Sequence, residues 1–363
     1  MLGPVSVALN PHLPRTGTAE ETPSAMLRTA LVAEWVVSRT GMLPGELTGF
    51  LDPRLKDLTD PDGMLDRDVA ARRLAKAISA GERVVVFGDY DCDGITSTAI
   101  LTECLRELAR VLKTEVRVIP QLANRFDGGY GVSEAATARI IAAKPHLLVT
   151  CDCGSSDHPS LRRIRAAGIE TVVIDHHLVP DEPLPVLAFL NPHRPECGFR
   201  YKGLASCGLV LSLAAALRKE LGVPLDVRRW LDLVAIGTIA DVAPLDGDNR
   251  ALVRAGLAAL RRAERPGLRA LLNLAKVSLE APITARDVGF RVAPQINAPG
   301  RMGAPDLALQ LLLAPDAAVA EALALQLQVI SDQRRQQQEQ MVEEACSLIE
   351  AQGDPSQPAI VVG

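Results

Sequence analysis

An apolar run that ends in regularly spaced aspartates constrains this chain more than any other stretch. Residues 84–94 read VVVFGDYDCDG, so Asp89, Asp91 and Asp93 follow an apolar segment at a spacing of two. If the run continues as a strand, these side chains project to the same face. Neighbouring carboxylates repel one another unless cations neutralise them, and hard divalent cations prefer oxygen ligands. The stretch therefore predicts a divalent-metal site at the carboxyl end of a buried strand. The alternative is a surface turn, in which Asp and Gly are also common.

Composition limits the classes of protein to which the chain can belong. It has 363 residues, enough for two domains, and its 48% hydrophobic and 23% charged residues are typical of a globular protein. A formal net charge of −5 excludes a generally basic surface, and 3% aromatic residues leave no obvious stacking platform, so nucleic acid would have to bind in a local groove. No signal peptide and no apolar run of membrane-spanning length is visible, which predicts a cytoplasmic protein without membrane contact.

The seven cysteines agree with that location. Their odd number and their apolar or motif contexts predict reduced thiols rather than a disulfide framework. Cys151 and Cys153 could suggest zinc, but their spacing is shorter than that of a usual zinc pair and no second pair exists. We therefore expect no zinc site.

Strand and helix patterns alternate in the first half of the chain. Apolar runs predict strands at 83–88, 115–119, 147–150 and 171–174, with helices at 96–112 and 159–167. This order is typical of an α/β fold with a parallel sheet and helices on both faces. The pattern then turns helical, at 206–221, 227–240, 249–263, 267–275 and 305–314. A long helical tract follows at 316–352, with Ser331 as a candidate interruption, and its polar middle suits a helix that bridges two domains.

These patterns divide the chain into six predicted segments. They are a flexible lead-in at 1–25, a helical N-terminal segment at 26–80, an α/β core at 81–245, a helical part of the same domain at 246–315, a connecting helix at 316–352 and the start of an incomplete domain at 353–363. Within the last segment, 358–362 reads as a strand without a partner, so we expect a fragment or a chain that lacks a further domain.

More metal-binding residue types occur at the ends of the other predicted strands. Asp152 follows the strand at 147–150, and Asp175, His176 and His177 follow the strand at 171–174. Because the carboxyl ends of parallel strands share one edge, these side chains can lie near the aspartates. Mixed carboxylate and imidazole ligation suits Mn²⁺, and two such ions can activate water and stabilise the leaving oxygen of a phosphoryl displacement. The alternatives are a helix cap or turn for Asp152, and one core and one exposed residue for the histidine pair.

The motifs resemble those of the DHH phosphoesterase superfamily. The short forms are GDYDCDG, Asp152 and the Asp175–His177 triplet. The longer GDYDCDGITSTAIL, the NRF and GYG motifs at 124–131, GTIADVAPL at 237–245 and INAPGRM at 296–302 resemble the RecJ exonucleases in particular, from about residue 27 to the C-terminus. The resemblance implies a DHH catalytic core at 81–245 and the start of a DHHA1-like domain at 353–363. It also implies a metal-dependent exonuclease that degrades single-stranded DNA from 5′ to 3′ and releases 5′-mononucleotides in recombination and repair.

Residue roles follow from the same resemblance. It implies two Mn²⁺ or Mg²⁺ ions with Asp91, Asp93, Asp152, His176 and Asp241 as ligands. Asp89 and His177 complete the implied catalytic set. The implied substrate-binding residues are Arg125, Tyr130, Asn297 and Arg301. A guanidinium can grip phosphate bidentately, which suits both arginines, and glycines around Arg125 allow a close backbone approach. The alternatives are a solvated loop residue for Arg125, a helix-edge salt bridge for Arg301 and an ordinary helix-terminal residue for Asp241. Asn297, Pro299 and Gly300 predict a shaped loop beside Arg301.

Several points depart from that pattern or leave alternatives open. After Gly154 the chain has Ser155, where the family usually has an apolar residue, and we do not expect His158 to be a ligand. The resemblance implies single-stranded DNA with a 5′ end as substrate, and single-stranded-DNA-binding protein and a helicase as partners. The alternative functions are a phosphodiesterase of the same superfamily that acts on short oligonucleotides or cyclic dinucleotides, and a truncated, non-catalytic relative.

Overall fold

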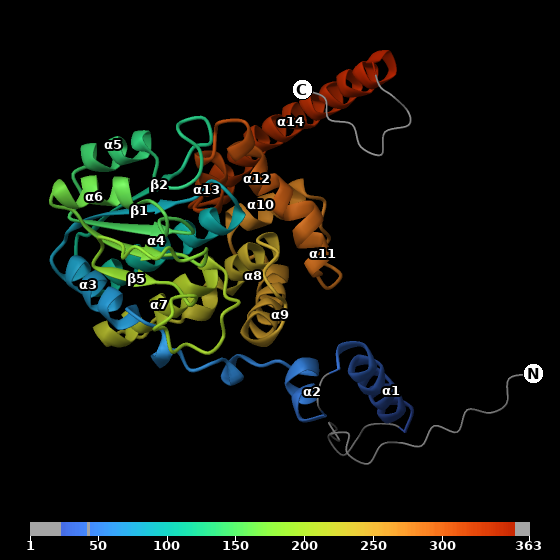
Figure 1. Cartoon of the computed structure of the whole chain (residues 1–363). Helices are drawn as coiled ribbons and strands as arrows, with labels where there is room; N and C mark the ends of the chain where they lie inside the picture. The colour runs from blue at the N-terminus through green and yellow to red at the C-terminus, as the bar shows by residue number, and fades with distance from the viewer. Residues whose placement is uncertain (1–22, 42–43, 353–363) are drawn as a thin grey trace, which may run out of the picture.

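A five-stranded parallel sheet forms the centre of the molecule (Figure 1). The computed structural model describes residues 23–41 and 44–352. The strands lie in the order β2-β1-β3-β4-β5, and each neighbouring pair is parallel. Their bounds are Arg83–Gly88 (β1), Arg117–Leu122 (β2), Leu147–Cys151 (β3), Glu170–Ile174 (β4) and Ala188–Leu190 (β5). The predicted α/β fold with a parallel sheet is confirmed, and the short strand β5 is an addition to it.

Helices cover both faces of this sheet, as predicted. Side chains alternate along β1, so Val84 and Val86 belong to one apolar cluster, and Val85 and Phe87 belong to another. Helices α3, α4 and α7 contribute to the first cluster, and α5 and α6 to the second. Their bounds are Arg67–Ser79 (α3), Cys92–Leu112 (α4), Glu134–Ala142 (α5), His158–Ala166 (α6) and Ser206–Leu221 (α7). Because both faces are covered, a site has to lie at an edge or at the strand ends.

The helical half of the chain extends the same core. Helix α8 is apolar on all sides and is buried from Leu231 to Thr238, because it packs against α4, α7 and α9. The elements of this half are Val227–Trp230 (η3), Leu231–Ala240 (α8), Gly247–Arg262 (α9), Pro266–Leu274 (α10), Ala285–Asp287 (α11), Val288–Val292 (the π-helix η4), Ala293–Arg301 (α12) and Asp306–Leu312 (α13). The predicted helices are confirmed here, although the one at 227–240 is divided into η3 and α8.

The long helix α14 spans Ala317–Gln352 without a break. Its first part packs against α10, α12 and α13, where Ala320, Ala324 and Leu327 are buried. Beyond Ser331 most side chains are exposed, and the helix extends away from the body of the molecule (Figure 1). The predicted interruption at Ser331 is wrong. The hydroxyl of this buried serine donates a hydrogen bond to Gln295 Oε1 (2.7 Å), so it does not compete with the helix backbone.

Short helices make up the N-terminal segment. They are Pro23–Thr40 (α1), Pro44–Leu51 (α2), Leu55–Asp57 (η1) and Pro61–Gly63 (η2). Helix α1 begins inside the predicted lead-in at 1–25, while the rest of that lead-in and the strand predicted at 358–362 lie outside the described residues. The domain boundaries stay predictions. Within 23–41 and 44–352, no helix has the length and apolar character needed to cross a membrane.

Candidate metal centre

The aspartates of the first motif lie on a loop and a helix, not on a strand. Strand β1 ends at Gly88, and α4 begins at Cys92, four residues earlier than predicted. Asp91 caps this helix, since its Oδ1 accepts a hydrogen bond from the Gly94 N–H (3.1 Å), and Asp93 lies in the first turn. The expectation that strand alternation aligns the three carboxylates is therefore wrong. A Cβ at Gly94 would lie 2.5 Å from the Asp89 carbonyl oxygen, so the turn requires glycine there.

Asp93 is held by the N-terminus of α7. Its Oδ2 accepts a hydrogen bond from the Ser206 N–H (2.6 Å) and its Oδ1 accepts one from the Cys207 N–H (3.0 Å). The carboxylate is fully buried at this positive end of a helix dipole. Burial raises the pKa of Asp93, although the nearby His176 opposes that shift. The backbone thus fixes Asp93 and leaves its charge to be balanced by the groups across the site.

Asp152 lies opposite, just after β3, with its backbone in the left-handed region at φ 64°. Its Oδ1 accepts a hydrogen bond from Ser206 Oγ (3.1 Å), and its carbonyl oxygen accepts one from the Tyr130 hydroxyl (2.8 Å). Burial, followed by the charge of Asp93, holds the pKa of Asp152 well above its usual range. A non-glycine residue in this conformation is strained, and two side chains hold it there.

The histidine pair is oriented by Asp175. This buried carboxylate accepts hydrogen bonds from the His176 N–H (2.8 Å) and the Ser155 N–H (3.0 Å), and it pairs with His177 Nδ1 (2.7 Å). Burial alone would raise the pKa of Asp175, but the bonds from His177 and Ser155 outweigh it and lower that pKa. The same pairing raises the pKa of His177. Asp175 therefore fixes the ring of His177 and the backbone of His176.

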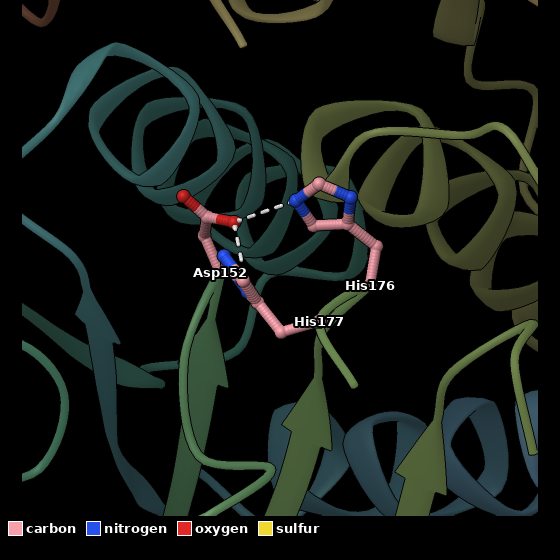
Figure 2. Close-up of side chains that lie close together, drawn as sticks. All are labelled: Asp152, His176 and His177. Atoms are coloured by element: carbon pink, nitrogen blue, oxygen red, sulfur yellow. Dashed lines mark ion pairs between the residues drawn. The ribbon is translucent and has the colours of Figure 1, made fainter. Parts of the chain in front are cut away.

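Two groups of ligand-type side chains result, and they share His176. Asp152, His176 and His177 form one group, shown in Figure 2, and Asp93, His176 and Asp241 form the other, with all ligand atoms of each group within 4.8 Å. His176 Nε2 lies 3.3 Å from Asp152 Oδ1, 3.7 Å from Asp241 Oδ2 and 4.0 Å from Asp93 Oδ2. The structure thus brings together five of the predicted site residues from β3, β4, α4 and α8. Asp89 and Asp91 lie outside both groups.

The donors fit a divalent metal ion. The buried His176 Nε2 has no hydrogen-bond partner although three carboxylates surround it, and the buried Asp89 Oδ1 has none either. Burial and Asp91 raise the pKa of Asp89 to about 7, and burial and Asp93 raise that of Asp241 to about 6. A cation among these oxygens would relieve their repulsion, and the added imidazole suits Mn²⁺. Neither of the two groups found among the described residues contains a cysteine.

The predicted substrate residues flank Tyr90, which stands between Asp89 and Asp91. The Arg125 guanidinium carbon lies 5.2 Å from the centre of the Tyr90 ring. Gly300, the residue before Arg301, also approaches Tyr90, since a Cβ at Gly300 would lie 2.8 Å from the Tyr90 carbonyl oxygen. Asn297 and Arg301 lie on the same helix, α12, so the shaped loop predicted around them is wrong. The structure brings these elements beside the first motif, and the Tyr130 hydroxyl faces Asp152 and His177.

Two residues that support the site were missed from the sequence. Ser206 binds both Asp93 and Asp152, as described above. Asn191 is fully buried after β5, donates a hydrogen bond to the His177 carbonyl (2.9 Å) and accepts one from the His193 N–H (2.8 Å). A polar residue directly after the apolar stretch 187–190 was the available signal for Asn191. The start of α7 at Ser206 was predicted, but its role was not, because it depends on the packing of that helix end against Asp93 and Asp152.

Comparison with known proteins places this geometry in a family. A model described as the DHH family, N-terminal domain, matches residues 83–238. The chain is 35% identical to the single-stranded-DNA-specific exonuclease RecJ of Bacillus subtilis over 92% of this chain and 41% of that protein. It is 37% identical to a solved exonuclease RecJ bound to manganese, over 82% of this chain and 73% of that one, with a TM-score of 0.71. It is 34% identical to RecJ of Thermus thermophilus in complex with Mn²⁺, over 94% of this chain and 48% of that one, with a TM-score of 0.74.

The matches cover most of this chain but only part of each curated relative. The chain spans about half the length of the curated relatives, from 41% to 59% of each. The solved exonuclease RecJ with manganese is matched over nearly three quarters of its length. The DHH family model at 83–238 includes the sheet, the aspartates of the first motif, Asp152 and the histidine pair, and it ends before Asp241. The chain belongs to the RecJ family of DHH-domain proteins.

Proposed function

We propose that the chain hydrolyses single-stranded DNA from a 5′ end with Mn²⁺ or Mg²⁺ and releases 5′-mononucleotides. The observation that carries this proposal is the pair of ligand groups that share His176 at the carboxyl edge of the sheet. Support comes from relatives named single-stranded-DNA-specific exonucleases and from a related structure that contains manganese. The family also motivates cytoplasmic DNA repair and recombination as the setting, with single-stranded-DNA-binding protein and a helicase as partners.

The residues divide into holding and positioning roles. Asp93, Asp152, His176, His177 and Asp241 form the two ligand groups and would hold the ions. Asp91, which lies outside both groups as the cap of α4, is proposed as a further ligand on the family resemblance. Bound divalent ions supply Lewis-acid stabilisation of the attacking and leaving oxygens. Asp175 orients the histidine pair, and Asp89 adds negative charge at the same edge. Arg125 and Arg301 are proposed to bind phosphates, because both are exposed, Arg125 lies over the Tyr90 ring, and Arg301 follows Gly300, which packs against the Tyr90 backbone.

A direct test is the release of mononucleotides from 5′-phosphorylated single-stranded DNA in Mn²⁺, compared with the Asp152→Asn variant. We expect release by the original chain and at least about 10²-fold less by the variant, whose Oδ1 faces His176 and Ser206. Cleavage of dinucleotides without cleavage of DNA would favour the small-substrate alternative. No cleavage of either substrate would contradict catalysis by this chain.

A rise in pH is expected to destabilise the metal-free protein, whereas added Mn²⁺ is expected to stabilise it. The metal-free protein should lose stability as pH rises from about 4 to about 7, because Asp89 and Asp241 have pKa values of about 7 and about 6 when folded, against 3.8 when unfolded. The folded state holds the extra protons in that window, so their release opposes folding. Added Mn²⁺ should raise Tm more at pH 8 than at pH 6, since the ion competes with those protons. Calorimetry at several pH values checks both trends, and equal Mn²⁺ shifts at pH 6 and pH 8 would contradict them.

Tyr130 is expected to tune the metal centre through its hydroxyl. The Tyr130 hydroxyl lies 2.8 Å from the strained Asp152 carbonyl and 3.0 Å from His177 Nδ1. Tyr130→Phe should weaken Mn²⁺ binding about 10-fold, because residues that orient ligands typically affect affinity by that order. Electron paramagnetic resonance titration measures it. Tyr90→Phe is the matched control, since its ring lies under Arg125. Equal losses of Mn²⁺ affinity in the two variants would contradict a specific role for the Tyr130 hydroxyl.

A further inference from the structure

Two exposed apolar side chains border the candidate metal centre. Among the large apolar residues that the structure describes, Leu178 and Val242 are the most exposed, at 90% and 87%. Leu178 directly follows His177, and Val242 directly follows Asp241. Both preceding residues belong to the ligand groups, and Asp241 Oδ2 lies 3.7 Å from His176 Nε2. The two most exposed large apolar residues among those described therefore stand next to the ligand groups.

The backbone of Val242 makes its exposure more costly. At the end of α8, the Val242 N–H bonds to the Ile239 carbonyl (3.2 Å) and the Ala243 N–H to the Thr238 carbonyl (3.3 Å). This is a Schellman motif, whose residue after the helix cap adopts the left-handed conformation and is usually glycine. Val242 has φ 59°, and it is the one β-branched residue with positive φ among the described residues. A branched side chain in that conformation is strained.

The strained backbone and the exposed side chain of Val242 are both unfavourable in the folded chain. Glycine would relieve the strain, and a polar residue would suit the solvent, so nothing inside the molecule accounts for valine here. Strained positions of this kind cluster at functional sites, where the side chain serves a bound molecule. The expected binding partner of this side chain is therefore external to the folded chain.

A second backbone irregularity lies beside the first. The π-helix η4 packs against α8, and a Cβ at Gly289 would lie 3.6 Å from Ile239 Cγ2. Single π-turns occur frequently at functional sites. This one presents Phe290, which is 79% exposed and the next most exposed large apolar residue after Leu178 and Val242. Leu178 and Val242 thus directly follow residues of the ligand groups, and Phe290 lies on the element that packs against the helix preceding Val242.

We propose that Leu178, Val242 and Phe290 form an apolar rim that contacts the faces of unpaired nucleobases while the neighbouring carboxylates and histidines bind the phosphate end. This rests on the proposed function, because a nucleotide combines a charged phosphate with a flat apolar base a few ångströms away. Apolar contact needs no hydrogen bond from the base, so the rim accepts any base. In a duplex the base faces are covered by their neighbours, so the rim selects unpaired strands.

Val242→Gly separates this role from a structural one, because its two effects have opposite signs. Relief of strain should raise Tm by about 1–4 °C. Loss of the side chain should weaken binding of a 5′-phosphorylated oligothymidylate about tenfold, as expected when one base contact is removed. Anisotropy with a phosphorothioate oligonucleotide measures the binding, and Mn²⁺ affinity should change by less than about twofold. Lys113→Gly is the matched control, since Lys113 has φ 56° at the remote C-cap of α4. It should raise Tm and leave DNA affinity unchanged.

Leu178→Ala tests the contact with the base itself. It should weaken binding of the same oligonucleotide, but not of one whose 5′-terminal nucleotides lack bases, while Leu325→Ala on α14 should affect neither. The rim would be overturned if Val242→Gly and Leu178→Ala both bound DNA as tightly as the original chain. It would also be overturned if Leu178→Ala lost equal affinity for both oligonucleotides. Either outcome would leave the proposed function intact. An original chain that binds no single-stranded DNA would overturn both. A change in the Mn²⁺ affinity of either variant without a change in its DNA affinity would also count against the rim.

Discussion

Replacement of His176 by alanine is expected to lower Mn²⁺-dependent DNA hydrolysis by about 10³-fold or more. His176 is the one residue common to both ligand groups, so its loss removes a donor from each. Its Nε2 is buried without a hydrogen-bond partner and faces the carboxylates of Asp93, Asp152 and Asp241. Without the imidazole, these carboxylates keep their mutual repulsion and lose the nitrogen donor that suits Mn²⁺.

The measurement is kcat for mononucleotide release, together with Mn²⁺ affinity. His146→Ala is the matched control, because His146 Nδ1 accepts a hydrogen bond from the Arg83 N–H (3.1 Å) at the opposite, amino end of the strands. The control should keep nearly full activity. If His176→Ala retained more than about a tenth of the original rate with an unchanged Tm, the shared-ligand arrangement would be wrong.

Replacement of Arg265 by methionine is expected to lower the free energy of unfolding by about 3 kcal/mol. Arg265 is 13% exposed and joins three helices, since its Nε lies 3.0 Å from Asp232 Oδ2 on α8 and its Nη1 binds Glu103 on α4. Glu103 also accepts a hydrogen bond from Trp230 Nε1 (2.8 Å). Methionine would keep most of the side-chain volume but leave the half-buried Glu103 and the buried Asp232 without their cation.

Urea unfolding gives the comparison directly. Arg228→Met is the matched control, because Arg228 forms an equally close pair with Asp226 (2.8 Å), but both side chains are mostly exposed. Exposed ion pairs contribute little, so the control should leave the urea midpoint nearly unchanged. Equal midpoints for both variants would mean that the Arg265 network does not connect α4, α8 and α10 energetically.

Strands β1, β3 and β4 were predictable because they are mainly continuous apolar runs, whereas β2 contains Pro120 and Gln121 and was predicted at 115–119 instead of Arg117–Leu122. Segments such as Leu147–Cys151 and Glu170–Ile174 are covered on both faces, and such strands lack the alternation that could be confused with a surface strand. Strand β5 was not predicted, because three residues are too few to show a pattern. Helix α12 escaped because Pro299 and Gly300, which normally break helices, lie inside it.

The site was predictable in its residues but not in its local geometry. The spacing of Asp89, Asp91 and Asp93 predicted a metal site through strand alternation, whereas Asp91 caps α4 and Asp93 is oriented by the start of α7. Those positions depend on tertiary packing, which a local pattern does not contain. Asp241 looked like an ordinary helix end, and only the packing of α8 against α4 brings it to His176.

The shape of α14 has a mechanical consequence. From Ser331 to Gln352 the helix forms a rod about 30 Å long with few contacts. The hydrogen bond from Ser331 to Gln295 fixes the base of this rod to α12, the helix that rests on Tyr90 and carries Asn297 and Arg301. A rotation of about 5° at that pivot moves the far end by about 3 Å. A force on the rod would therefore act on α12, and through Gly300 on the Tyr90 backbone beside the first motif, so that the far end of α14 and the edge of the metal centre are mechanically connected.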